Sequence, residues 1–268
     1  MASTFISRGA QGYDRYMGRW SARLAPLFLD FAGLAAGDRV LDVGCGTGNL
    51  ALAVAARPDI LSVDAIDYEE QFVLALRRRN TDQRVTVHRG DACALPFTDA
   101  SFDRALSMLV LHFVSDAPRA VAEMRRVLRP GGVAAATVWD TYGGMPSQRI
   151  FWDTVAALEP SALGRRVASL IRPATRPGEL LALFGQAGFA QITEAMLTIR
   201  MDFESFDDYW HPLIGGQGTL AAFLSELPAE IRGRIEQGVR AAYLCGQPEG
   251  PRSFASVAWA IRGVVPLK

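Results

Sequence analysis

The stretch Val40-Leu41-Asp42-Val43-Gly44-Cys45-Gly46-Thr47-Gly48-Asn49-Leu50 decides the fold of this chain. Its first half is apolar and β-branched, its middle holds three glycines, and an alanine-rich helical pattern follows. This order predicts a strand, a tight turn and the start of a helix. Glycines suit such a turn because it demands unusual backbone angles and because a ligand must approach the bare backbone. Units of this kind bind nucleotide-like molecules at the carboxyl edge of a sheet.

The spacing of the glycines indicates which nucleotide-like molecule to expect. A dinucleotide site requires G-x-G-x-x-G, whereas here the glycines are Gly44, Gly46 and Gly48, and Asn49 stands where the third dinucleotide glycine belongs. A carboxylate, Asp42, precedes the first glycine by two residues. The stretch resembles motif I, D-x-G-x-G-x-G, of the class I S-adenosylmethionine-dependent methyltransferases, and the resemblance implies that the turn, Cys45 included, binds this cofactor.

A second carboxylate follows the next predicted strand, residues 60–66. Asp67 lies about 25 residues beyond Asp42, where one strand–helix–strand unit places the acid that accepts hydrogen bonds from ribose hydroxyls. Tyr68 would then lie beside the adenine. The alternative is that Asp67 only caps a helix over residues 68–79.

Two further stretches extend the resemblance. Residues 90–97, Gly-Asp-Ala-Cys-Ala-Leu-Pro-Phe, resemble the family's G-D-a-x-x-L-P-F loop, which implies that Asp91 and the backbone N–H of Ala92 recognise the adenine edge. An Asx-turn is the alternative role for Asp91. The predicted strand 102–107 ends at Ser107, and the segment from Ser107 to Phe113 would pass the sulfonium centre, with Ser107 and Met108 as the candidate cofactor contacts. Residues 128–132, Leu-Arg-Pro-Gly-Gly, also resemble the family, so the likeness covers residues 40–139.

This resemblance implies an α/β fold of the Rossmann-like class I methyltransferase type. It has a seven-stranded, mostly parallel sheet with an antiparallel last strand and helices on both faces. We expect one domain with an N-terminal lid and helix (1–36) and a cofactor-binding core (37–140). Strands over 189–200 and 254–261 are predicted, and they are separated by a long insert. Because long inserts in compact domains are usually functional, we expect 141–175 and 203–250 to form substrate caps.

The N-terminal segment, residues 13–20, is rich in aromatics and arginine. In relatives of this type such a segment folds over the methionine end of the cofactor. Tyr16 and Arg19 are therefore the candidates here, Arg19 because a guanidinium pairs with a carboxylate. The alternative is a solvated leader that covers the edge of the domain.

Acceptor-side candidates lie after the later strands. His112 follows the fourth predicted strand and is the candidate general base, with simple packing in the turn as the alternative. Trp139 ends the fifth strand, and Trp210 and His211 lie in the second insert, so these three are the candidate pocket residues. The insert's aromatics favour a largely apolar acceptor. Alternatively, the insert buries them against a second copy of the chain and forms a homodimer.

Composition narrows the class of protein. The chain has 268 residues, half of them hydrophobic, and 28 basic against 28 acidic side chains, which speaks against a broad nucleic-acid surface. Cys45, Cys93 and Cys245 match no metal-ligand spacing, so we expect no metal and a reduced, cytoplasmic protein. Neither a signal peptide nor a membrane span is predicted.

The sequence therefore predicts an S-adenosylmethionine-dependent methyltransferase that acts on a small-molecule acceptor by in-line displacement. Two alternatives stay open. One is a protein that binds S-adenosylmethionine without catalysis, since binding motifs persist without activity. The other is a dinucleotide-dependent oxidoreductase, which the third glycine position and the lack of a Tyr-x-x-x-Lys pair disfavour.

Overall fold

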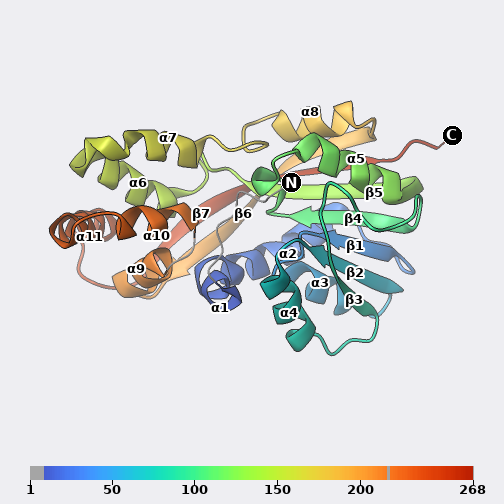
Figure 1. Ribbon diagram of the computed structural model, residues 1–268, viewed down its shortest axis with the longest axis horizontal. Helices are drawn as coiled ribbons and strands as arrows, with labels where there is room; N and C mark the ends of the chain where they lie inside the picture. The colour runs from blue at the N-terminus through green and yellow to red at the C-terminus, as the bar shows by residue number, and fades with distance from the viewer. Residues whose placement is uncertain (1–8, 216–217, 268) are drawn as a thin grey trace.

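A seven-stranded sheet forms the centre of the protein. A computed structural model describes residues 9–215 and 218–267. The strand order is β3-β2-β1-β4-β5-β7-β6 (Figure 1). Strands β1 to β5 pair in parallel, and β7 is antiparallel to both of its neighbours. The strands are β1 Arg39–Val43, β2 Ser62–Asp67, β3 Val85–Arg89, β4 Phe102–Met108, β5 Leu128–Trp139, β6 Ala190–Phe203 and β7 Arg252–Val264. The predicted α/β fold with an antiparallel last strand is confirmed.

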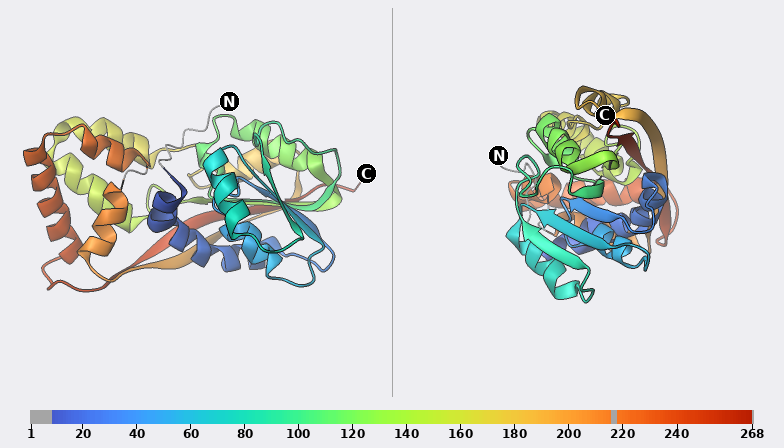
Figure 2. Two further views of the ribbon diagram at one scale, coloured as in Figure 1. Left: turned by 60° about the horizontal axis from the view of Figure 1, so that its bottom comes forward. Right: turned by 90° about the vertical axis from the view of Figure 1, so that its right-hand side faces the viewer.

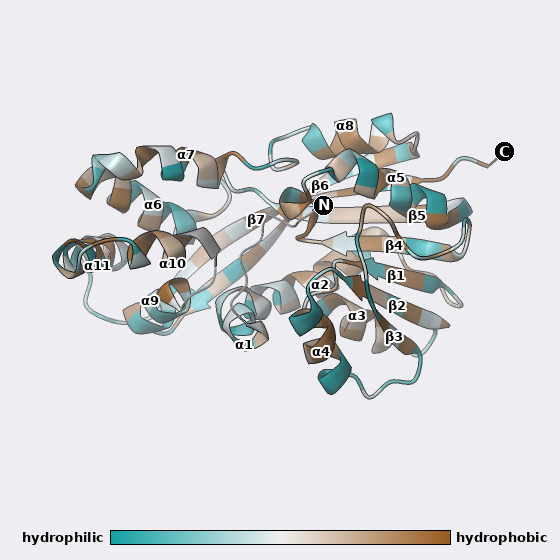
Figure 3. Ribbon diagram, in the orientation of Figure 1, coloured by the Kyte–Doolittle hydropathy of each residue, from teal (hydrophilic) through white to brown (hydrophobic). Residues whose placement is uncertain are grey.

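Helices cover both faces of this sheet. Buried residues of α2 (Arg19–Ala32), α3 (Asn49–Ala55) and α4 (Glu70–Arg79) pack in one hydrophobic cluster. Those of α5 (Ala117–Val127) and α8 (Glu179–Gln186) pack in the other. The middle of α4 is hydrophobic and its ends are hydrophilic (Figure 3). Its acidic first turn and basic last turn complement the helix dipole.

The strand order places a crevice at the end of β1. The chain runs outward from β1 through β2 to β3, then returns to pair β4 on the other side of β1. At such a reversal the loops that follow the two central strands diverge, and ligands bind between them. The glycine turn after β1 and the segment after β4 therefore flank one site.

Five helices form a cap at one end of the elongated molecule, where β6 and β7 extend beyond the rest of the sheet (Figures 1 and 2). They are α6 Pro146–Leu158, α7 Leu163–Leu170, α9 Phe206–Ile214, α10 Gly218–Ser225 and α11 Ala229–Leu244. Helix α6, from the first insert, packs against α11, from the second. The two inserts, which are far apart in the sequence, therefore pack together in one cap.

Several predicted boundaries differ from the structure. The first insert holds two helices, α6 and α7. Strand β6 continues to Phe203 and β7 starts at Arg252, so both exceed the predicted ranges. The extra residues continue the β6–β7 pairing out to the cap, as Phe203 opposes Arg252. Among the helices of the described residues, none is both long and apolar enough to cross a membrane.

The cap is held together by aromatic side chains, so its stability can be tested at one of them. Phe206 is 0 % exposed and packs on Trp210, with ring centroids 5.6 Å apart, and on Tyr243. We expect Phe206→Ala to lower the free energy of unfolding by about 3–5 kcal/mol because it leaves a cavity. Urea unfolding followed by tryptophan fluorescence measures this. Leu163→Ala, at a side chain that is 54 % exposed in the same cap, should cost less than about 0.5 kcal/mol. Equal losses would contradict the assignment.

Candidate functional site

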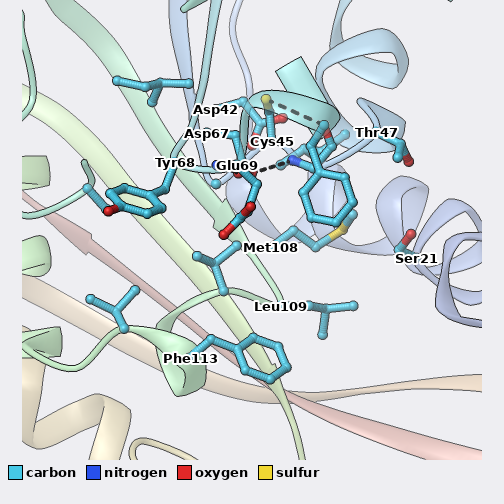
Figure 4. Close-up of a pocket in the computed structure, with 18 of the residues that line it drawn as sticks. Ser21, Asp42, Cys45, Thr47, Asp67, Tyr68, Glu69, Met108, Leu109 and Phe113 are labelled. Carbon is cyan, nitrogen blue, oxygen red and sulfur yellow. Dashed lines mark hydrogen bonds between the residues drawn. The ribbon is translucent and has the colours of Figure 1, made fainter. Parts of the chain in front are cut away.

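One cavity lies in the crevice at the end of β1, and we call it the glycine-loop cavity (Figure 4). Asp42 and Asp67 lie close together at one side of it, and Phe113 lies at the other. Its walls come from four places in the chain: the N-terminal helices, the glycine turn, the ends of β2 and β3, and the segment after β4. The lining residues include Tyr13, Ser21, Asp42, Gly44, Cys45, Gly46, Asp67, Tyr68, Asp91, Ala92, Met108, Leu109, Val110, Phe113 and Val114.

The glycine turn is fixed by backbone contacts that side chains would disturb. The N–H groups of Gly44 and Cys45 both donate to the carbonyl of Ile66, at 2.8 and 3.0 Å. Gly44 has a φ of 79°, and a Cβ there would lie 2.5 Å from the side chain of Val110. Gly48 has a φ of 97°, and a Cβ there would clash in the same way with the side chain of Leu76. Both positions therefore require glycine. Gly48 shapes the turn and is not itself part of the cavity lining.

Asp67 joins the glycine turn to the start of α4. Its Oδ2 accepts from the N–H of Gly46 at 2.8 Å, and its Oδ1 accepts from the N–H of Glu69 at 2.9 Å. Burial raises the pKa of this carboxyl to about 6, against the opposing effect of these two N–H groups. Helix α4 begins at Glu70, and its N-cap residue is Glu69. Asp67 therefore precedes the N-cap and is not itself the capping residue of this helix. Its carboxylate also faces the cavity.

Asp42 is a buried carboxylate that lacks a partner for one oxygen. It is 1 % exposed, and Oδ2 has no hydrogen-bond partner in the part of the chain that the structure describes. Burial, followed by the negative charge of Asp67, raises its pKa to about 8, and the N–H of Ala51 partly offsets this. A buried polar atom of this kind needs a donor or a cation, and a ligand in the cavity can supply one.

The N-terminal segment closes the same cavity through Tyr13 and Ser21. Helix α1 (Ala10–Tyr13), a π-helical turn over Asp14–Gly18 and α2 follow one another. Tyr13 packs on Phe72, with ring centroids 5.2 Å apart. The segment is tied to the turn because Thr47 Oγ1 donates to Asp14 at 2.6 Å and Asn49 Nδ2 donates to Ser21 Oγ at 2.8 Å.

Tyr16 and Arg19 do not line the glycine-loop cavity, so their positions do not support the expected contact with the methionine end. Both line a second cavity, between the N-terminal helices and the cap, which we call the cap cavity. Arg19 forms an ion pair of 2.8 Å with Asp208 of α9. The π-helical turn changes which residues face the core. Tyr13 was therefore not predicted, although it lies in the same aromatic stretch.

On the other wall, three predicted residues line the glycine-loop cavity. Tyr68 is 45 % exposed there, and Asp91 and Ala92 follow β3. Asp91 Oδ1 accepts from the N–H of Cys93 at 2.8 Å, so the Asx-turn expected as its alternative role is present. The turn occupies one oxygen of this carboxylate. Their contacts with an adenine remain a prediction.

The segment after β4 brings apolar side chains into the cavity. Met108 lines it as predicted, whereas Ser107 is fully buried outside it, because adjacent residues of a strand face opposite sides of the sheet. Leu109 has a φ of 65°, a strained conformation for a leucine, and strain of this kind concentrates at functional sites. Leu109, Val110 and Phe113 were missed individually, although the sequence pointed to their segment.

His112 is poorly suited to remove a proton, which corrects its candidate role. It is 4 % exposed and does not line the glycine-loop cavity. Burial, followed by the positive charge of Arg172, lowers its pKa to about 3. A group with so low a pKa is a weak base at neutral pH.

The predicted pocket residues also lie elsewhere. Trp139 and Trp210 are 4 % and 3 % exposed and belong to the hydrophobic core. His211 is exposed on the surface of α9. None of the three lines the glycine-loop cavity. Within residues 9–215 and 218–267 there is no cluster of three or more potential metal ligands.

Comparisons with known proteins agree with this geometry. Residues 41–136 match the family described as "Methyltransferase domain". A 27-O-demethylrifamycin SV methyltransferase of Amycolatopsis mediterranei is 36 % identical over 115 residues, 42 % of each chain. A demethylmenaquinone methyltransferase of Renibacterium salmoninarum is 35 % identical over 141 residues, 52 % of this chain and 57 % of that one. The solved structure of the [4+2]-cyclase SpnF, at 25 % identity and a TM-score of 0.56, covers all of this chain and 89 % of its own.

The core of this chain is therefore similar in sequence and fold to class I S-adenosylmethionine-dependent methyltransferase domains. The matched residues, 41–136, contain the glycine turn, Asp67 and the segment after β4. Domains of this family bind S-adenosylmethionine, and we expect its ammonium to pair with the unpartnered oxygen of Asp42. The chain spans about half the length of the curated relatives it matches.

Replacing Asp67 tests its predicted contact with the cofactor. Asp67→Ala removes a charged acceptor, and hydrogen bonds to charged groups contribute about 1.5–3 kcal/mol, so we expect roughly a 10- to 150-fold weaker affinity for S-adenosylhomocysteine by calorimetry. Asp64→Asn is the matched control, because Asp64 lies on the same strand and pairs with His88 at 2.6 Å. An unchanged affinity in a folded Asp67→Ala variant would leave Asp67 a purely structural residue.

Asp42 should make cofactor affinity depend on pH. Its carboxyl has a pKa of about 8 in the free protein, and pairing with an ammonium requires the ionised form. Binding below pH 8 therefore releases a proton, so we expect affinity for S-adenosylhomocysteine to rise from pH 6 to 8 and then level off. Calorimetry in buffers of different ionisation enthalpy measures both quantities. Asp42→Asn should bind more weakly and lose this slope, and a flat wild-type profile would contradict the role.

Proposed function

We propose that this protein transfers a methyl group from S-adenosylmethionine to a small-molecule acceptor. The observation that carries the proposal is the glycine-loop cavity. It combines the fixed glycine turn with two carboxylates, Asp42 with an unpartnered oxygen and Asp67 at the end of β2. A match to the methyltransferase domain family over these residues supports it.

In this proposal the chain mainly provides binding and alignment. The cofactor supplies a methyl group already activated on a sulfonium, so alignment of the acceptor accounts for much of the catalysis, worth several kcal/mol of barrier. Asp67 and Asp42 hold the cofactor from one side, and Tyr13 and Ser21 close over it from the N-terminal segment. Closure excludes water from the reacting groups.

In this proposal the apolar segment after β4 and the cap bind the acceptor. Leu109, Val110 and Phe113 give the cavity an apolar wall, which favours a largely apolar acceptor. The N-terminal segment is linked to both inserts, through Arg19 to Asp208 and through Tyr16 to Gln148. We therefore propose that 141–175 and 203–250 close the acceptor side. The free thiols of Cys45, Cys93 and Cys245 fit a reducing, cytoplasmic setting.

One alternative has a specific observation in its favour. SpnF, which matches the whole of this chain, is a [4+2]-cyclase, so a relative with this fold has another activity. A protein that binds S-adenosylmethionine without methyl transfer is therefore the second candidate. A dinucleotide oxidoreductase has no such support.

Labelled methyl distinguishes these candidates. We expect protein incubated with S-adenosylmethionine labelled in its methyl group, together with a collection of small metabolites, to transfer the label to at least one acceptor and to release S-adenosylhomocysteine. The Asp67→Ala variant should need higher cofactor concentrations for the same turnover. A compound that is consumed while the label stays on the cofactor would contradict methyl transfer and favour the second candidate. So would tight cofactor binding with no label transferred to any member of the collection.

A further inference from the structure

We propose that the open edge of β6 pairs with the same edge of a second copy of this chain. The two β6 strands run antiparallel in this pairing, and a two-fold axis passes between them at Leu197. Strand β6 is the outermost strand of the sheet, beyond β7 (Figure 2, right). Assembly of this kind is independent of the proposed methyl transfer.

The edge that β6 offers is long. The strand has 14 residues and no proline, whereas β3, at the opposite edge of the sheet, has 5 residues. Short strands, prolines and bulges are common means of preventing pairing at a sheet edge. The register shift between β6 and β7 lies between Ala190 and Thr193, so the pairing is regular from Thr193 to Phe203. Met196, in this regular part, is a large apolar side chain that is 62 % exposed.

The hydrogen bonds of β7 show which backbone groups of β6 are turned towards it. The N–H of Asp140 donates to the carbonyl of Val257 at 2.9 Å, and the N–H of Val257 donates to the carbonyl of Gly144 at 2.8 Å. The backbone of Val257 therefore faces the β5 side of β7. Successive residues of an antiparallel strand face opposite sides, so Ala258 faces β6, where it opposes Leu197. Leu197 is thus turned towards β7, and the residues on either side of it are turned outward.

A side-chain contact confirms this alternation. The carbonyl of Arg200, three residues after Leu197, accepts from Arg23 Nη1 at 2.8 Å, and Arg23 belongs to α2 and not to the sheet. By the same alternation Met196 and Thr198 direct their N–H and C=O groups to the open edge. Among the described residues no group bonds to the backbone of either. These two residues therefore offer free donors and acceptors to another strand.

One register of the pairing brings opposite charges together. With the axis at Leu197, Met196 lies opposite Thr198 of the second copy. Glu194 then lies opposite Arg200 of the second copy, and by symmetry each pair occurs twice. All four side chains are on one face of the strand, because they occupy alternate positions. Pairs of opposite charge placed in this way stabilise antiparallel strands.

A shift of the axis by one residue removes this match. An axis at Thr198 would place Glu194 opposite Asp202, and like charges directly opposite each other are destabilising. Arg200 is available for the first register, since in the described chain its guanidinium bonds only to the hydroxyl and the carbonyl of Ser253, both at 2.8 Å. The charges on β6 therefore favour the axis at Leu197.

Sedimentation velocity over about 5 to 500 µM protein measures this assembly. An edge-to-edge contact is small, and interfaces below about 1,200 Å² belong to weak complexes, so we expect a dimer with a dissociation constant in the micromolar range. Glu194→Arg and Arg200→Glu should each weaken the dimer at least about 5-fold, because like charges then face each other twice. The double exchange, Glu194→Arg with Arg200→Glu, should restore the wild-type affinity.

Amide hydrogen exchange gives a second measurement, at the backbone. The N–H groups of Met196 and Thr198 should exchange rapidly at low protein concentration and become protected at high concentration. The N–H of Leu197, which is turned towards β7, should be protected at both.

Glu236→Arg is the matched control, because it makes the same change of charge at an exposed residue of α11 in the cap. It should dimerise as the wild type does. A wild type that stays monomeric throughout overturns the proposal, as does a dimer that the single exchanges leave unchanged or that the double exchange fails to restore. A dimer that Glu236→Arg weakens equally, or that leaves the exchange of Met196 and Thr198 unaltered, would form through another surface and also overturns it.

Discussion

The site depends on how the end of β2 holds the glycine turn. The carbonyl of Ile66 accepts from two successive N–H groups of the turn, and the Asp67 carboxylate accepts from a third, at Gly46. These bonds fix the backbone before any ligand binds, so little ordering remains to be done on binding. They also place Asp67 beside Asp42, and burial of both carboxylates opposes their ionisation. Ionisation of both carboxyl groups is therefore unfavourable in the free protein, and a cationic ligand beside them would favour it.

Much of the core could be predicted because its constraints are local. Gly44 and Gly48 are required by positive φ angles and by the close approach of Val110 and Leu76, and such requirements appear directly in a sequence. Strand ends carry Asp42, Asp67 and Asp91 at spacings set by one strand–helix–strand unit each. These residues line the cavity as expected, although their contacts with a cofactor remain predictions.

The acceptor side could not be predicted in the same way, since its residues are placed by long-range packing. Next to a π-helical turn over Asp14–Gly18, Tyr13 and not Tyr16 lies against the glycine turn. The sequence of Asp14–Gly18 does not indicate this change of helical period. Trp210 resembles a pocket residue in sequence, but the cap needs a core of its own and buries it there.

The position of the cap has a consequence for how such proteins diversify. The second insert leaves the sheet at Phe203 and returns at Arg252, and these two residues oppose each other in the β6–β7 pairing. A segment whose ends are neighbours can be exchanged for another of different length without altering the strand order. The glycine turn follows β1, which β4 and β5 separate from β7 in the sheet, so such an exchange would leave the turn in place. The two curated relatives, a 27-O-demethylrifamycin SV methyltransferase and a demethylmenaquinone methyltransferase, are similar to this chain over 42 % and 52 % of its length.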